Sequence, residues 1–191
     1  MSQGFGLVQV ITGNGKGKTT TALGMALRAA GHGFKVCIIQ LLKGGSYLGE
    51  LKAMARLPEI TIHQFGVDCQ HPENIDSEGR LECNGCRACF LLKQEDRQKC
   101  REALDLAEKV LKDKACDLLI LDEINVALDK GLVSVDEAMQ LIRLKPESIE
   151  LVFTGRNAPE ALIDKADLVT VFRHLKHPFD NCLPSRKGIE Y

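Results

Sequence analysis

Short apolar runs alternate along this chain with longer segments in which apolar residues recur every three or four positions. A short run bounded by turn residues is typical of a buried strand, and the longer spacing is typical of an amphipathic helix. Most of the runs are continuously apolar, which favours a parallel sheet covered on both faces. The predicted strands are Leu7–Ile11, Val36–Leu42, Ile60–Phe65, Leu118–Leu121, Leu151–Thr154 and Leu168–Phe172.

Three helices are predicted between these strands. The first has an apolar stripe at i, i+3, i+4 and i+7, formed by Leu23, Ala26, Leu27 and Ala30. The second has a longer stripe, formed by Cys100, Ala103, Leu104, Ala107, Val110 and Leu111. The third begins at Ser134, which forms a capping box with Glu137, and continues through Ile142. The predicted fold class is therefore α/β, a doubly wound and mostly parallel sheet of about six strands with helices on both faces.

Length and composition place this pattern in one domain. The chain has 191 residues, 45% of them hydrophobic and 27% charged, which is ordinary for a globular domain and predicts a single unit over residues 1–191. A net charge of −1 gives no reason to expect nucleic acid as a partner. No apolar run approaches the roughly 18 residues of a membrane span, and the first residues lack a signal-peptide core, so no membrane is expected and the predicted location is the cytoplasm.

A glycine-rich loop lies between the first predicted strand and the first predicted helix. Such a loop lets successive backbone N–H groups point inward, a lysine adds positive charge, and a following threonine hydroxyl can bind Mg²⁺. The usual phosphate-loop pattern has glycine where Thr12 stands, and here the glycine is shifted by one position. The residues predicted to bind ATP are Gly13, Asn14, Gly15, Lys16, Gly17, Lys18, Thr19 and Thr20.

A second motif supports nucleotide binding. The apolar strand at 118–121 is followed directly by Asp122 and Glu123, the form of a Walker B segment in which a carboxylate holds the Mg²⁺ of the nucleotide. Thr19, Asp122 and Glu123 are therefore the candidate Mg²⁺ ligands. From these residues alone Glu123 is either a general base that activates water or a metal ligand.

The segment at about 66–89 is polar, rich in cysteine and too long for a plain connector, so it is predicted to be a loop insertion. Its thiols at Cys69, Cys83, Cys86 and Cys89 can form a zinc site or bind an iron–sulfur cluster. His71 is an alternative fourth ligand, and a reduced loop without metal is the other reading. Three other thiols are expected in the core, namely Cys37 in a predicted strand, Cys100 in a predicted helix and Cys116 just before another predicted strand.

Several of these motifs together resemble one family, the P-loop ATP:cob(I)alamin (corrinoid) adenosyltransferases. The resemblance rests on TGNGKGKTT at 12–20, RAAGHG at 28–33, QLLKG at 40–44, LDEI at 121–124, TGR at 154–156, KHPFD at 176–180 and the ending KGIEY. It extends over almost the whole chain, and the shifted glycine is the family's own form of the loop.

The resemblance implies an activity and a set of roles. The family transfers the 5′-deoxyadenosyl group of ATP to the Co(I) of a reduced corrinoid and releases triphosphate. Lys18 would then stabilise the leaving group, Thr19 and Glu123 would hold Mg²⁺ with Asp122 in support, and Arg28 and Arg156 would lie on the ATP side of the pocket. The resemblance also implies an electron-donor reductase as a partner and assembly of the chain into a homodimer.

Two alternative functions remain open at this point. One is a Mg²⁺-dependent P-loop ATPase in which Glu123 activates water, and it predicts phosphate as the product. The other is a nucleotide-responsive regulatory module whose metal loop binds a partner, and it predicts ATP binding without turnover.

Overall fold

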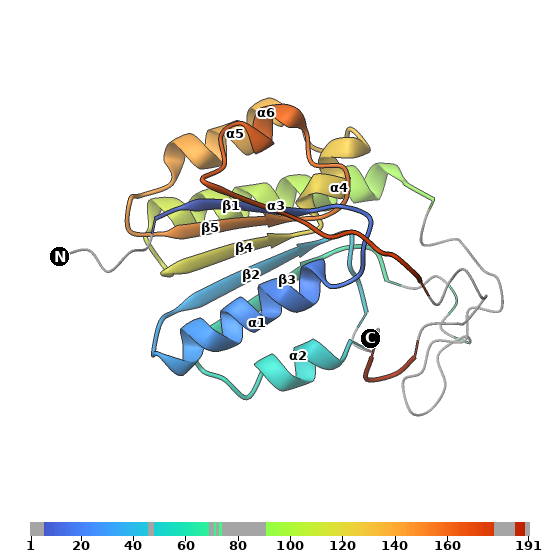
Figure 1. Ribbon diagram of the computed structural model, residues 1–191, viewed down its shortest axis with the longest axis horizontal. Helices are drawn as coiled ribbons and strands as arrows, with labels where there is room; N and C mark the ends of the chain where they lie inside the picture. Colours follow the sequence, from blue (N-terminus) through green and yellow to red (C-terminus); the bar gives the residue numbers. More distant parts are fainter. Residues whose placement is uncertain are drawn as a thin grey trace.

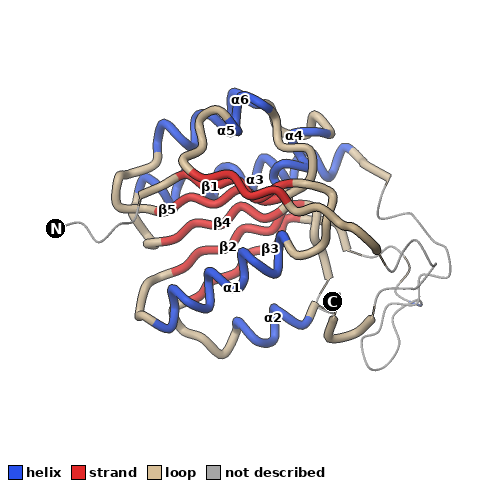
Figure 2. Tube along the Cα trace, in the orientation of Figure 1, coloured by secondary structure: helices blue, strands red, loops and turns tan. Residues whose placement is uncertain are grey.

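The computed structural model describes residues 6–45, 48–68, 71, 73, 91–177 and 186–189. Within these residues six strands form one sheet in the order β3-β2-β4-β5-β1-β6, and every neighbouring pair is parallel (Figures 1 and 2). The strands are β1 (Val8–Thr12), β2 (Val36–Leu41), β3 (Ile60–Phe65), β4 (Leu118–Asp122), β5 (Glu150–Thr154) and β6 (Leu168–Val171). The predicted α/β class and parallel sheet are confirmed, with each strand boundary within one residue of its prediction.

Helices cover both faces of this sheet. Those of the described residues are α1 (Lys18–Gly31), α2 (Gly49–Met54), α3 (Gln94–Lys112), α4 (Ile124–Asp129), α5 (Val135–Leu144) and α6 (Glu160–Ile163). Helices α1 and α2 lie on one face, and α3 to α6 lie on the other (Figure 1). The sequence pattern missed α2, α4 and α6, because helices of four to six residues are too short to display a 3.6-residue period.

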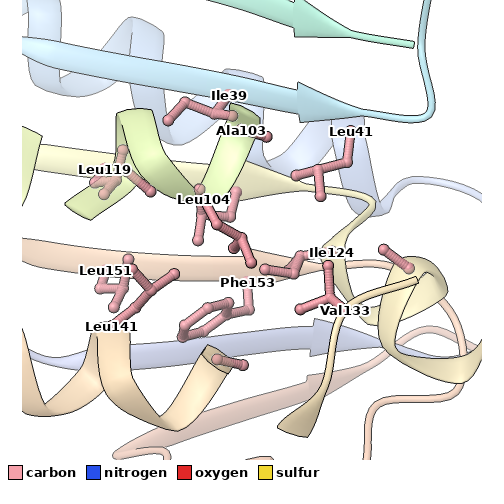
Figure 3. Close-up of a cluster of buried hydrophobic side chains, with 14 of the residues drawn as sticks. Ile39, Leu41, Ala103, Leu104, Leu119, Ile124, Val133, Leu141, Leu151 and Phe153 are labelled. Atoms are coloured by element: carbon pink, nitrogen blue, oxygen red, sulfur yellow. The ribbon is translucent and has the colours of Figure 1, made fainter. Parts of the chain in front are cut away.

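Alternation along each strand divides the core into two layers. In β4, Leu119 and Leu121 point to the α3 face, whereas Leu118 and Ile120 point to the α1 face. Figure 3 shows the larger layer, where side chains of β2, β4 and β5 meet those of α3 and α5 around Phe153. The sheet is therefore buried on both faces, as the continuous apolar runs predict.

Helix α1 packs through a different stripe from the predicted one. Its buried residues include Ala22, Ala26, Ala29 and Ala30. Leu27 is 55% exposed, so its predicted place on the buried face is wrong. A stripe of alanines lets the helix approach the sheet closely, and the larger leucine is then left outside the contact.

The other two predicted helices are confirmed with their details. All six apolar residues named for α3 are buried. Ser134 is the N-cap of α5: its hydroxyl accepts a hydrogen bond from the Glu137 N–H, and the Glu137 side chain accepts one from the Ser134 N–H. Both Cys100 and Cys116 are buried core thiols, and burial raises the pKa of Cys100 to about 11 and that of Cys116 to about 12.

The parallel order places all strand carboxyl ends at one edge of the sheet, where the arrowheads of Figure 1 end. Among the described residues no helix is long and apolar enough to cross a membrane. A single domain over 1–191, with an insertion at about 66–89, stays a prediction.

Candidate active site

The loop between β1 and α1 has a backbone that requires glycine at the shifted position. Gly13 has φ 98° and Gly17 has φ 115°, both in the left-handed region that side chains disfavour. A Cβ on Gly13 would lie 2.2 Å from the carbonyl oxygen of Phe172. The close approach of this neighbouring backbone explains why glycine stands at 13 while Thr12 still belongs to the strand.

Residues after β6 hold the loop from the side. The N–H of Phe172 donates to the Thr12 carbonyl at 2.8 Å, and the N–H of Gly15 donates to the Phe172 carbonyl at 2.9 Å. A Cβ on Gly15 would come within 2.8 Å of the backbone of Arg173. The phosphate loop is thus fixed at both its start and its middle before α1 begins.

Lys18 and Thr19 open α1 and face the strand ends. Lys18 is buried, and its Nζ donates to the Gly15 carbonyl at 2.7 Å. Burial lowers the pKa of Lys18, an effect that the negative charge of Glu123 partly opposes. The Thr19 hydroxyl donates to Asp122 Oδ1 at 2.9 Å, which joins the phosphate loop to the end of β4.

Asp122 is 1% exposed and accepts four hydrogen bonds from side chains. Its Oδ1 accepts from Thr154 at 2.6 Å and from Thr19, and its Oδ2 accepts from Lys43 Nζ at 2.7 Å and from Gln40 at 3.2 Å. Burial works to raise the pKa of Asp122, but the Lys43 charge and these hydrogen bonds outweigh it and hold the pKa below its usual value. The group is therefore an ionised carboxylate at neutral pH.

Glu123 has a strained backbone. Its φ of 64° lies in the left-handed region, and its N–H donates to the Thr154 hydroxyl at 3.1 Å. Burial, together with the neighbouring charge of Asp122, raises the pKa of Glu123. A non-glycine residue in this conformation is costly, and such residues are concentrated at functional sites.

These residues surround a cavity of about 510 Å³. Its lining is formed by the phosphate loop and the residues that face it, namely Gly15, Lys16, Gly17, Lys18, Thr19, Thr20, Leu23, Lys43, Leu48, Gly49, Glu50, Glu123, Arg156, His177, Gly188 and Ile189. The volume is within the usual range for small-molecule sites. Four Lys and Arg side chains against two Glu side chains make the wall suitable for a polyphosphate.

The structure brings most of the predicted site residues together. Residues 15–20 of the loop, Glu123 and Arg156 line the cavity, and Asp122 lies beneath it in contact with Thr19. Gly13 and Asn14 belong to the same loop but are not part of the lining. Arg28 is not brought to this site: it lies exposed in the last turn of α1, about 15 Å along the helix from Lys18 at 1.5 Å per residue.

The predicted metal ligands divide into two groups. The hydroxyl of Thr19 and the carboxylates of Asp122 and Glu123 are oxygen donors, and they fit Mg²⁺, which takes one or two carboxylates and completes its shell with phosphates and water. Cys69, Cys83, Cys86 and Cys89 lie outside the described residues. In the part of the chain that is described, no group of three or more His, Cys, Asp or Glu side chains can hold a metal, and His71 contacts Glu73 at 2.9 Å.

Three residues of the site were not predicted as such. Lys43, Gln40 and Thr154 all contact Asp122, although each stood within a motif of the resemblance. Gln40 lies in β2 and Thr154 ends β5, and both flank β4 in the sheet. Polar residues at the ends of several apolar strands were the available signal, because parallel strands end at one edge.

Comparison with known proteins agrees with this geometry. The family model described as ATP:corrinoid adenosyltransferase BtuR/CobO/CobP matches residues 4–191. A corrinoid adenosyltransferase of Pseudomonas aeruginosa is 35% identical, over 97% of this chain and 84% of its own length. Corrinoid adenosyltransferases of Sinorhizobium sp and Escherichia coli are 34% and 31% identical over 97% of this chain, covering 80% and 86% of their own lengths. This chain belongs to the ATP:corrinoid adenosyltransferase family.

Proposed function

We propose that this protein transfers the 5′-deoxyadenosyl group of ATP to the Co(I) of a reduced corrinoid, releasing triphosphate, in adenosylcobalamin biosynthesis or salvage. The observation that carries the proposal is the contact between Thr19 and Asp122 at the floor of a cavity lined by the phosphate loop. It joins the two halves of a nucleotide site in a chain whose family carries out this transfer.

The reaction needs little acid–base chemistry. Co(I) attacks the ribose C5′ with its own electron pair and forms the Co–C bond, while the C5′–O bond breaks and its electrons leave with triphosphate. Because Co(I) has no proton to lose, the site must hold ATP, stabilise the leaving group and exclude water. This favours Glu123 as a metal ligand rather than a base that activates water.

The charged groups of the cavity suit this task. Lys18 and the N–H groups of the loop would bind the triphosphate, on which negative charge grows as C5′ is transferred. Thr19, Asp122 and Glu123 would hold Mg²⁺, whose charge would further neutralise the departing triphosphate. Arg156 lines the same cavity and supplies another cation.

Anaerobic incubation with MgATP and a chemically reduced corrinoid tests the function. The expected result is a light-sensitive Co–C bond, seen in the absorption spectrum, with one intact triphosphate for each corrinoid converted. The matched control omits the corrinoid and should leave ATP unchanged. Rapid phosphate release in that control would indicate an ATPase, and ATP binding without either product would indicate a regulatory module.

The finer assignments are also proposals. We propose that the enzyme acts in the cytoplasm as a homodimer and receives reduced corrinoid from a reductase. Sedimentation analysis tests the dimer, and coupled assays with candidate reductases test the electron donor.

The cysteine segment is proposed to bind one metal centre through Cys69, Cys83, Cys86 and Cys89. The segment has few apolar residues to offset its ordering entropy of about 1–2 kcal/mol per residue, and a thiolate site can supply the missing free energy. Elemental analysis of anaerobically purified protein should find zinc or iron in an amount that corresponds to about one metal centre per chain. Cys86→Ser should remove the metal, whereas Cys100→Ala, in the buried face of α3, should retain it.

A further inference from the structure

A neighbouring segment of the same chain, at Phe65 and Gly66, fixes the backbone position of Lys43. Lys43 follows β2 by two residues, after Leu42, whose φ of 57° is in the left-handed region. The N–H of Leu42 donates to the Phe65 carbonyl at 2.9 Å. A Cβ on Gly66 would lie 2.3 Å from the backbone of Lys43, so the two segments pass at a distance that only glycine allows. The turn therefore directs Lys43 back across the strand ends.

The side chain of Lys43 contacts both residues of the bond that joins the phosphate loop to β4, at the Thr19 hydroxyl and at the other carboxylate oxygen of Asp122. Its Nζ lies 2.7 Å from Asp122 Oδ2 and 3.4 Å from Thr19 Oγ1. Lys43 is 21% exposed, whereas Asp122 is 1% exposed. The ammonium thus reaches inward from the cavity wall to a carboxylate that is otherwise bound by neutral donors.

Gln40 keeps the carboxylate in place independently of Lys43. It is fully buried, donates to Asp122 Oδ2 at 3.2 Å and accepts from Gln64 at 3.1 Å. With the hydroxyls of Thr19 and Thr154 on the other oxygen, Asp122 keeps three hydrogen bonds if the ammonium leaves. Lys43 is therefore the one cation among these donors, and it also lines the cavity.

We propose that Lys43 is a positioning residue that holds the magnesium site before the metal binds and exchanges with Mg²⁺ when nucleotide enters. Its ammonium contacts the same donors, Thr19 and Asp122, that the proposed function assigns to the metal. Two cations on these oxygens would repel each other strongly, because charges in a buried site are weakly screened. With Mg²⁺ on these oxygens, Nζ would turn toward the cavity that Lys43 lines, where the triphosphate of the bound ATP is the available anion.

The exchange predicts opposite effects on two measurements. Replacing the ammonium removes the competitor of Mg²⁺, so less metal is needed. It also leaves Asp122 without its compensating charge when no metal is present, so the free protein is less stable. If Lys43 only stabilised the fold, its replacement would weaken both Mg²⁺ binding and the stability of the free protein.

The test variant is Lys43→Met, which has a side chain of similar length without charge. Free Mg²⁺ is titrated at saturating ATP without corrinoid, and ATP binding is followed by calorimetry. The expected midpoint of the Mg²⁺ titration is about tenfold lower than in the unchanged protein. In EDTA without nucleotide, the Tm of Lys43→Met should be lower by about 4 °C, and this deficit should shrink with MgATP. Lys43→Arg, which keeps the charge, should retain a midpoint near that of the unchanged protein.

Lys112→Met is the matched control. Lys112 also pairs with a carboxylate, Glu108, at 2.8 Å, but on the surface of α3 near the amino ends of the strands. The midpoint of the Mg²⁺ titration in Lys112→Met should equal that of the unchanged protein. An unchanged or higher midpoint in Lys43→Met, or a Tm deficit equally large with MgATP, would overturn the proposal.

The inference rests on the proposed function only for the identity of the nucleotide and metal. Its readouts need no corrinoid, so the two can fail separately. A tenfold lower midpoint in a protein that forms no Co–C bond would retain the exchange and overturn the transferase. Normal Co–C bond formation with an unmoved midpoint would do the reverse.

Discussion

Carboxylates at both edges of the sheet accept hydrogen bonds, but different donors hold them. At the carboxyl edge, Asp122 is held by side chains that come from α1, β2, β5 and the loop after β2. At the amino edge, Glu150 accepts from the N–H groups of Gly6 and Leu7 at 3.0 and 2.9 Å, and Asp167 accepts from the N–H of Val8 at 2.8 Å.

This difference separates a site from a structural connection. Backbone N–H groups cannot turn away, so Glu150 and Asp167 fasten the start of β1 and the two residues before it to the neighbouring strands. Side-chain hydroxyls and an ammonium can change partners without moving the sheet. The carboxyl edge can therefore exchange ligands on a scaffold that the amino edge helps to keep in register.

The largest effect is expected from Lys18→Ala, which removes a positive charge from the carboxyl edge of the sheet. Stabilisation of a leaving group in a water-poor site is worth roughly 10²–10³ in rate, so adenosyl transfer should fall by about that factor. The measurement is Co–C bond formation under anaerobic single-turnover conditions.

The fold should survive this change. Lys18 contacts the Gly15 carbonyl, and the backbone contacts of the loop with Phe172 do not involve it. Circular dichroism and Tm should therefore be close to those of the unchanged protein. Turnover within threefold of normal would move the active site away from this loop.

The next effect is expected from Gly15→Ala, which tests how tightly β6 confines the loop. The added methyl would meet the backbones of Phe172 and Arg173 at 2.8–2.9 Å, so the loop must shift. ATP affinity, measured by calorimetry, should fall at least about tenfold, since the amides that face phosphate move with the loop.

Gly24→Ala is the matched control for this change. Gly24 lies in α1 with nothing within 4 Å of its added Cβ. Replacement of glycine inside a helix should stabilise the protein by about 0.5–1 kcal/mol and leave ATP binding unchanged. Equal affinity in both variants would show that the loop tolerates displacement.

The architecture could be predicted from the sequence because its signals are local. The continuous apolar runs gave all six strands, and the stripe from Cys100 to Leu111 gave α3. Leu27 was misplaced because periodicity alone does not distinguish a stripe of alanines from a neighbouring stripe containing leucine. The short helix α4 was missed, although it places Glu123 in its strained conformation.

The loop and the two acids of the site could also be predicted, because their residues are adjacent in sequence and carry distinctive spacing. Lys43 could not, since its role depends on a left-handed turn at Leu42 and on the distance to a strand 79 residues later. Arg28 illustrates the reverse case, in which a residue within a family motif lies away from the phosphate loop.

Glu150→Ala is expected to have a moderate effect, on stability alone. It leaves two N–H groups and the Gln9 amide, which donates to Glu150 at 2.6 Å, without their acceptor. Since these groups are partly buried, the free energy of unfolding should fall by about 2 kcal/mol. Denaturant unfolding measures this loss, and adenosyl transfer per folded molecule should not change. A comparable loss of activity would show that the two edges are coupled.

The smallest effect concerns Glu137, an exposed carboxylate held in the same manner as Glu150. Its Oε2 accepts from the N–H and the hydroxyl of Ser134 at 2.7 and 2.6 Å, and these bonds lower the pKa of Glu137. Glu137→Ala should reduce the free energy of unfolding by about 1 kcal/mol at pH 7. Because the folded-state pKa is the lower one, the unfolded chain binds the proton first as pH falls. The contribution of the carboxylate is therefore complete above its ordinary pKa of 4.5 and disappears as pH falls through the folded value. The measurement is urea unfolding of Glu137→Ala and the unchanged protein at pH 7 and near pH 3. The difference between their free energies of unfolding should shrink toward zero at the lower pH. A difference that stayed constant would mean that packing, rather than the ionised cap, stabilises α5.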